Sequence, residues 1–179
     1  MRKGIFHAVS IGTTTGYATT DFYLWPGFLP LMLVFLSFVG GCTASTGGGM
    51  KVIRVLLLGK QGLREVQRLI HPHAHIAVKV NGRVMPERVV EAVWGFMAAY
   101  VLAFAIMTLL LMASGLDQVT AFSAVAATLN NLGPGLGDVG PNFAGINDFS
   151  KWVLVFSMLL GRLEIFTVLV LLSPAFWRR

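Results

Sequence analysis

Charged residues are scarce in this chain. Lys, Arg, Asp and Glu make up 12% of its residues, whereas a soluble domain has roughly 25%. Hydrophobic residues reach 55% and the mean hydropathy is +0.73, so a water-soluble core could not hide this much apolar surface. We therefore predict an all-α integral membrane protein that lies in the lipid bilayer.

Cysteine and membrane-embedded ionisable residues are also scarce. The single cysteine, Cys42, excludes an internal disulfide and a multi-cysteine metal site. Only Arg162 and Glu164 lie deep in an apolar tract, so an intramembrane enzyme would lack its nucleophile, base or metal ligands. We expect no enzymatic activity and no covalently bound cofactor. The net charge of +6 does not indicate a nucleic acid partner, because the basic residues gather in one loop and at the termini, as membrane topology requires.

Three long apolar tracts follow one another along the chain. The first covers 27–58 but is interrupted by "GGCTASTGGGMK" at 40–51, the second covers 89–113, and the third covers 152–174. A membrane-spanning helix needs about 20 apolar residues. The helix-like stretch 118–129 is too short to span and fits a re-entrant half-helix, which enters and leaves the membrane on one side.

Basic residues fix the expected orientation. Segment 60–88 is predicted to be a cytoplasmic loop, with a β-hairpin at Asn81-Gly82. The C-terminus, Arg178-Arg179, falls on the same side, and the segment before the third tract is predicted to be extracellular. The basic residues of the loop are Lys60, Arg64, Arg68, Lys79, Arg83 and Arg88.

A sparse internal repeat relates the two ends of the chain. Each half contains a short helix, a glycine-bearing turn, a polar stretch and a long helix, an order common in membrane transport proteins. A shift of 117 residues, or 120 after a short insertion, produces these pairs: Thr14 with Asn131, Thr15 with Leu132, Gly16 with Gly133, Asp21 with Asp138, Ser37 with Ser157, and Gly41 with Gly161.

The stretch "SIGTTTGYATT" at 10–20 explains what such turns could do. Non-helical backbone survives at membrane depth only where protein buries it or where it lines water. There, carbonyl oxygens aimed by glycine conformations can replace the hydration shell of a cation, and threonine hydroxyls add oxygen without charge. We interpret 14–16 and 131–133 as arms of a cation selectivity filter; a polar contact between helices is the alternative.

The chain resembles the TrkH/TrkG/KtrB family of potassium-uptake proteins, and within it the TrkH branch. The resemblance covers essentially all residues and depends on "SIGTTTGYATTDF", "GGCTASTGGGMK", "NNLGPGLGDVGPNF" and "LLGRLEIFTVLVLLSP" in this order. It implies four helix–pore-loop–helix repeats around one potassium path, with Gly16 and Gly133 as filter glycines. It also implies a homodimer in the bacterial inner membrane and a cytosolic partner of the TrkA type, which alone would bind nucleotide.

One departure from the family pattern changes what this chain alone should do. It holds a third repeat without its first helix (1–59), the basic loop (60–88) and the fourth repeat (89–179). We therefore expect a fragment or the product of a truncated gene, which should not conduct potassium by itself. The alternative to conduction is a part with only an assembly or regulatory role.

The resemblance also assigns a gate. The residues Thr43, Ser45, Gly47, Gly48 and Gly49 would belong to an intramembrane loop that interrupts a helix beneath the filter. Consecutive glycines favour such a break, since each costs about 1 kcal/mol in a helix relative to alanine. Arg162 would lie in the pore beside this loop and donate to its carbonyls and hydroxyls. A kinked helix, and an arginine that only ties helices together, are the alternatives.

Overall fold

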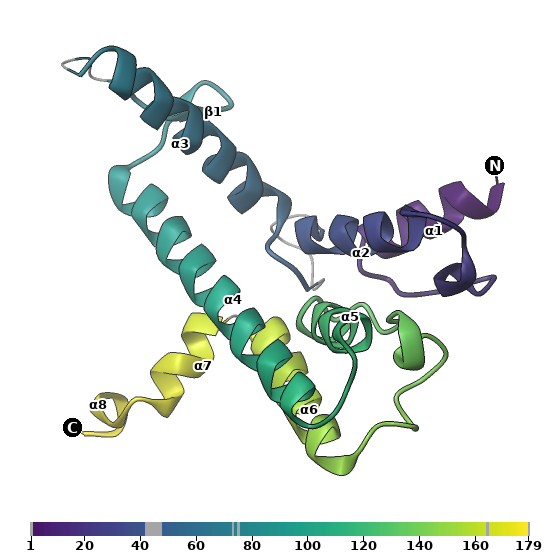
Figure 1. Ribbon diagram of the computed structural model, residues 1–179. Coiled ribbons are helices and arrows are strands. Elements are labelled where there is room, and N and C mark those ends of the chain that lie inside the picture. Colours follow the sequence, from purple (N-terminus) through teal and green to yellow (C-terminus); the bar gives the residue numbers. More distant parts are fainter. Residues whose placement is uncertain (1, 42–47, 73, 75, 164, 179) are drawn as a thin grey trace.

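A computed structural model of the chain is mostly helical (Figure 1). It describes residues 1–179 except 1, 42–47, 73, 75, 164 and 179. The helices and strands are α1 (Arg2–Gly12), the short 3-10 helix η1 (Phe22–Leu24), α2 (Leu29–Val39), α3 (Val52–Ile70), β1 (Lys79–Val80), β2 (Arg83–Val84), α4 (Glu87–Ala113), α5 (Gln118–Leu129), η2 (Gly137–Val139), α6 (Asp148–Leu163), α7 (Ile165–Leu172) and α8 (Pro174–Trp177).

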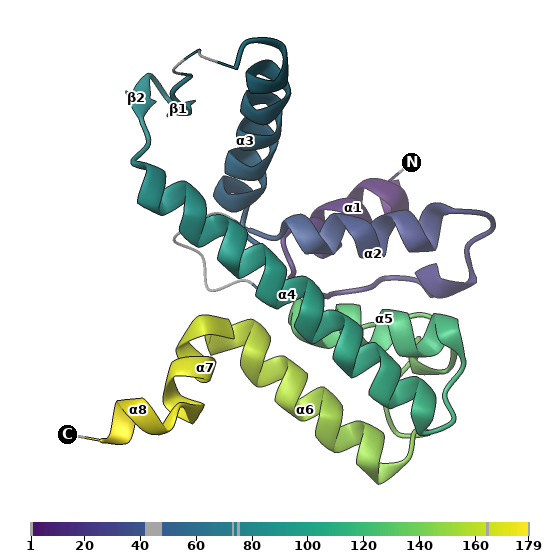
Figure 2. The same ribbon diagram turned by 60° about the vertical axis from the view of Figure 1, so that its left-hand side comes forward.

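The first apolar tract is broken where the glycines predict it. Helix α2, which packs along α1, ends at Val39, and Gly40 follows with a φ of 67° that suits glycine. The chain returns beside this end, because Met50 N donates to Phe38 O at 2.9 Å. Helix α3 then begins at Val52 and runs away from α2 (Figures 1 and 2).

The predicted cytoplasmic loop is partly helical. Helix α3 continues through Lys60 to Ile70, so the first part of 60–88 is not loop. Before Lys60, Leu57 packs with Val78 and Val90. After it, the apolar side chains of the helix, such as Leu63 and Leu69, are exposed. The hairpin itself is confirmed: β1 pairs with β2, and Asn81 and Gly82 have φ of 49° and 78°, as a type I′ turn requires.

Helix α5 lies in the centre of the molecule, packed against α4 and α6 (Figure 2). Its bounds match the predicted half-helix. Asp117 caps its first turn, accepting from Val119 N at 3.1 Å and Thr120 N at 3.2 Å. Hydrogen bonds from Thr120, through its side chain and then its backbone, lower the pKa of Asp117. Small residues let the neighbouring helices approach closely, so nearly every residue from Thr120 to Leu129 is buried.

The third apolar tract differs from the expected single crossing. Helix α6 begins at Asp148 and ends at Leu163, and α7 leaves in another direction (Figures 1 and 2). The polar interruption at Gly161-Arg162 coincides with this change. Among the described residues, α4 is the helix whose length and apolar composition suffice to cross a bilayer.

Candidate functional site

The two predicted filter segments follow equivalent helix ends. Helices α1 and α5 both close with a Schellman motif, in which two backbone N–H groups beyond the helix donate back into its last turn. Their hydrogen bonds match after the shift of 117 residues. They are Thr14 N to Ile11 O (3.0 Å), Thr15 N to Ser10 O (2.8 Å), Asn131 N to Thr128 O (3.0 Å) and Leu132 N to Ala127 O (2.7 Å).

Each turn contains a residue other than glycine with a positive φ, and in the first turn, at Thr14, it is strained. Thr14 and Asn131 have φ of 56° and 53°, and the left-handed conformation is rare for a β-branched residue such as threonine. Thr14 Oγ1 and Asn131 Nδ2 are also buried without a hydrogen-bond partner in the described part of the chain. Strain and unpaired polar atoms are costs that proteins retain mainly at functional sites.

The structure brings the two turns together. A Cβ atom on Gly16 would lie 1.9 Å from the carbonyl oxygen of Leu132, so the backbones of the two segments touch at this point. Gly16 has a φ of 80° and Gly133 a φ of 103°, both in the region that favours glycine. In contrast to Gly16, Gly133 has open space where its side chain would be.

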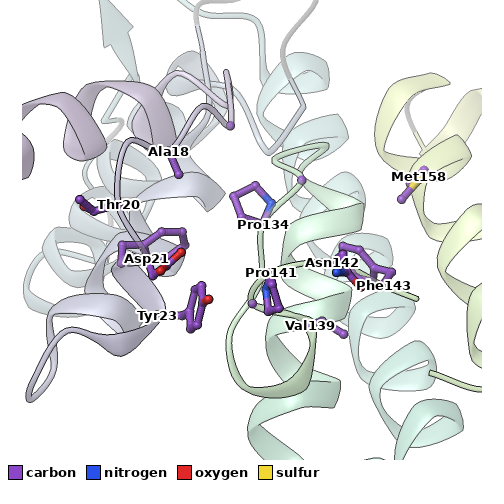
Figure 3. A pocket seen from close by; sticks show the side chains of 14 residues that line it. Ala18, Thr20, Asp21, Tyr23, Pro134, Val139, Pro141, Asn142, Phe143 and Met158 are labelled. Atoms are coloured by element: carbon purple, nitrogen blue, oxygen red, sulfur yellow. The ribbon is translucent and has the colours of Figure 1, made fainter. Parts of the chain in front are cut away.

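Beyond the turns, the same two segments line an open cleft of about 490 Å³. Figure 3 shows Asp21 and Tyr23 on one side of it, with Pro134 and Pro141 opposite. Desolvation raises the pKa of Tyr23, and the Asp21 carboxylate adds to this through its charge and a hydrogen bond. An exposed carboxylate at the mouth of a narrow passage raises the local concentration of cations.

Side chains on α5 and α1 also hold the segments that follow the turns. Ser123 Oγ donates to Leu136 O at 3.0 Å and accepts from Leu136 N at 2.9 Å. On α1, Ser10 Oγ donates to Tyr17 O at 2.7 Å. The sequence reasoning missed these contacts. The sequence does show a serine within each predicted short helix, Ser10 and Ser123. It does not show which backbone group each serine contacts, because that depends on the path of the chain after the turn.

Part of the predicted gate can be placed. Gly48 lies against the turn that follows α5, since a Cβ there would be 2.0 Å from Asn130 O. Gly49 has a φ of 79° beside the end of α2. Arg162 is exposed in the last turn of α6, directly after Gly161, which packs against Leu129 O. Thr43, Ser45 and Gly47 lie outside the described residues.

Comparison with known proteins agrees with the resemblance. A family model for TrkH, described as a cation transport protein, matches residues 1–179. The Trk system potassium uptake protein TrkH of Vibrio parahaemolyticus is 61% identical over 98% of this chain and 36% of its own length. TrkH of Halomonas elongata is 57% identical over 100% of this chain and 37% of its own length. TrkG of Escherichia coli is 42% identical over 97% of this chain and 36% of its own length.

A solved structure supports the fold. The crystal structure of the potassium transporter TrkH from Vibrio parahaemolyticus matches with a TM-score of 0.91 and 61% sequence identity, covering 98% of this chain and 38% of that one. The chain thus spans less than two fifths of the length of these relatives. Their names denote transporters, in agreement with the expected lack of enzymatic activity. The chain belongs to the TrkH family of cation transport proteins.

Proposed function

We propose that this segment forms two of the four walls of a potassium-selective pore. Residues 1–59 would be most of a third helix–pore-loop–helix repeat and 89–179 the fourth, joined by the cytoplasmic region 60–88. The matching turns after α1 and α5, which meet at Gly16 and Leu132, are the observation that carries this proposal. Potassium is the proposed ion because the relatives are named potassium uptake proteins.

The turns would act through backbone oxygen. Carbonyls of 14–16 and 131–133, with the Thr14 and Thr15 hydroxyls, would replace part of the hydration shell of a potassium ion. No carboxylate is needed among them, which suits a monovalent cation. Asp21, at the cleft, would attract cations to the entrance. No resident cofactor takes part in this function.

The assembly in which the segment works is also a proposal. It would be a homodimer of the full-length subunit in the bacterial inner membrane, with its C-terminus in the cytoplasm. A cytosolic ring of TrkA-like partners would bind the regulatory nucleotide. The alternative is a part with only an assembly or regulatory role.

The experiment uses a chimaera in which this segment replaces the matching part of the full-length Vibrio parahaemolyticus relative. In a bacterial strain without its own potassium uptake, Gly133→Ser should lower the potassium-over-sodium preference roughly tenfold, as about 1.4 kcal/mol of strain at the filter would. Gly16→Ser should lower this preference at least as much, because the serine side chain would meet Leu132 O.

Gly115→Ser is the matched control. Gly115 also has a positive φ, 99°, and open space around it, but lies between α4 and α5. Gly115→Ser should strain the backbone as much as Gly133→Ser does and leave ion selectivity unchanged. Unaltered selectivity in Gly133→Ser, at normal protein levels, would remove the filter assignment. A chimaera that assembles without transporting would favour the assembly role.

We further propose that Arg162, with 43–49, forms the gate. A positive charge in the pore would oppose cation passage, so Arg162→Ala should raise potassium flux per assembled subunit in reconstituted vesicles, while Arg162→Lys should not. An arginine that only ties helices together would instead give less protein and less flux in the alanine variant. A decrease in flux with intact assembly contradicts the gate.

A further inference from the structure

A chain of buried hydrogen bonds crosses the turn that follows α5 through Asn130. Tyr100 Oη donates to Asn130 Oδ1 at 2.5 Å, and Asn130 Nδ2 donates to Ser37 Oγ at 2.9 Å. Ser37 Oγ then donates to Val34 O at 2.6 Å. The chain links α4, the end of α5 and α2, which come from distant parts of the sequence.

The donors in this chain all point one way. Ser37 uses its proton on Val34 O, so its oxygen can only accept from Asn130, and the amide oxygen is left to accept from Tyr100. The side chains of Asn130 and Ser37 are completely buried, and Tyr100 is 4% exposed. A fully satisfied polar network in such surroundings rigidifies the elements that it joins.

Asn130 is placed where this rigidity reaches the proposed filter. It is the C-cap residue of α5 and directly precedes the segment 131–133. Its carbonyl lies against Gly48. Thr13, the equivalent residue of the other half, is exposed and its hydroxyl donates back to Val9 O at 2.7 Å. The two turns thus have similar backbones. Among the described residues, Asn130 joins its turn to α4 and α2, whereas the hydroxyl of Thr13 bonds within α1.

We propose that Asn130 is a positioning residue for ion selectivity. The chain Tyr100–Asn130–Ser37 would hold the fourth filter segment at the spacing that suits potassium, between α2 on one side and α4 on the other. This inference depends on the proposed function, since it names what holds one arm of that filter. It assigns a role to three residues that lie outside the proposed filter segments.

Two variants each remove one link with little change in shape. In the full-length chimaera, Tyr100→Phe removes the donor to Asn130 Oδ1, and Ser37→Ala removes the acceptor of Asn130 Nδ2. Each should lower the potassium-over-sodium preference per assembled subunit about fivefold, the factor that corresponds to one hydrogen bond. Because both act through Asn130, the double variant should not show the product of the two effects.

Thr108→Val is the matched control. It also removes a hydroxyl from α4, where Thr108 Oγ1 donates to Phe104 O of its own helix at 2.8 Å, and it should leave selectivity unchanged. Should one of the two variants assemble poorly, the selectivity of the other decides. A purely structural network would reduce the amount of protein while the selectivity of the assembled remainder stays the same, which would overturn the inference.

Comparison with Gly133→Ser separates the two proposals. If Gly133→Ser changes selectivity and both Tyr100→Phe and Ser37→Ala do not, the filter assignment stands and the positioning role of Asn130 fails. If none of the three changes selectivity, the proposed filter fails and takes this inference with it. A lower potassium-over-sodium preference in all three variants, with the preference of Thr108→Val unchanged, supports both the filter assignment and the positioning role of Asn130.

Discussion

At the scale of single residues, His7 is a buried polar side chain with contacts on every side. It is completely buried on α1, with Nδ1 2.7 Å from Lys3 O and Nε2 3.1 Å from Thr20 O. The rings of Phe22 and Trp25 pack on it at 5.9 and 5.1 Å between centroids. Carbonyl oxygens only accept, and a neutral imidazole has one N–H, so a neutral ring can donate to only one of them.

With the proton on Nε2, His7 donates to Thr20 O and ties α1 to the segment after the turn that follows it, whereas donation from Nδ1 stays within α1; in both forms the ring packs between α1 and that segment. His7→Leu should therefore destabilise the chimaera by about 1–3 kcal/mol, the cost of a buried acceptor left without a donor. Thermal unfolding in detergent measures this. His71→Leu, at an exposed position after α3, is the control and should change the midpoint little. Equal effects of the two substitutions would mean that the buried contacts contribute no stability.

At the scale of elements, the close approach of α6 to α5 determines the surroundings of the turn that follows α5. A Cβ atom on Gly161 would lie 2.0 Å from Leu129 O and 2.7 Å from Asn131 Nδ2. One turn earlier, Thr128 Oγ1 donates to Ser157 Oγ at 3.1 Å. Small residues at such contacts let helix backbones approach closely, as in other membrane helix pairs.

Gly161→Ala should push α6 away from α5. Because the nearest atom belongs to backbone, the strain cannot be relieved by a side-chain rotation, and we expect reduced assembly of the chimaera and reduced selectivity in what assembles. Gly59→Ala in α3 is the control: it has open space around it and should stabilise its helix by up to about 1 kcal/mol. The amount of chimaera in the membrane measures assembly, and competition between potassium and sodium measures selectivity. Normal behaviour of Gly161→Ala would contradict the close contact.

The elements also show what a sequence can and cannot predict. Helix α5 and the hairpin were predictable from local patterns: the short helix-like stretch 118–129, and Asn81-Gly82 in the turn. The continuation of α3 to Ile70 was missed because its apolar side chains are exposed and polar pairs along the helix, Gln61 with Glu65 and Arg68 with Glu65, support it instead. The end of α6 at Leu163 was missed because hydropathy alone does not register a change of helix direction.

At the scale of the whole molecule, contacts between distant segments complete the candidate site. The repeat predicted that Gly16 and Gly133 occupy similar turns, and their backbones agree. It could not predict that Tyr100 and Ser37, 30 and 93 residues from Asn130, would meet there, because no local pattern encodes a tertiary partner. Many large apolar side chains on α2, α4 and α6 are exposed, which suits lipid or further parts of a larger subunit.

The region 60–88, which is predicted to be cytoplasmic, offers the last test, that of the proposed TrkA-like partner. Arg64 is a poor probe, because its side chain is 11% exposed and contacts Glu65 at 3.5 Å and Glu87 at 3.9 Å; its reversal would disturb the packing of α3 on α4. Arg68 and Arg83 are exposed. If this region attracts an acidic surface, Arg68→Glu with Arg83→Glu should lower co-purification of the partner with the chimaera.

The effect should depend on ionic strength, because charges at an exposed interface are screened over about 8 Å at physiological salt. We therefore expect the wild-type and doubly reversed chimaeras to differ most at low salt and to converge as salt is added. Lys151→Glu, on the side predicted to be extracellular, should leave binding unchanged and so controls for altered net charge. Binding that persists after 79–84 is replaced by a glycine–serine linker, and after both reversals, would show that the region between α3 and α4 serves only membrane topology.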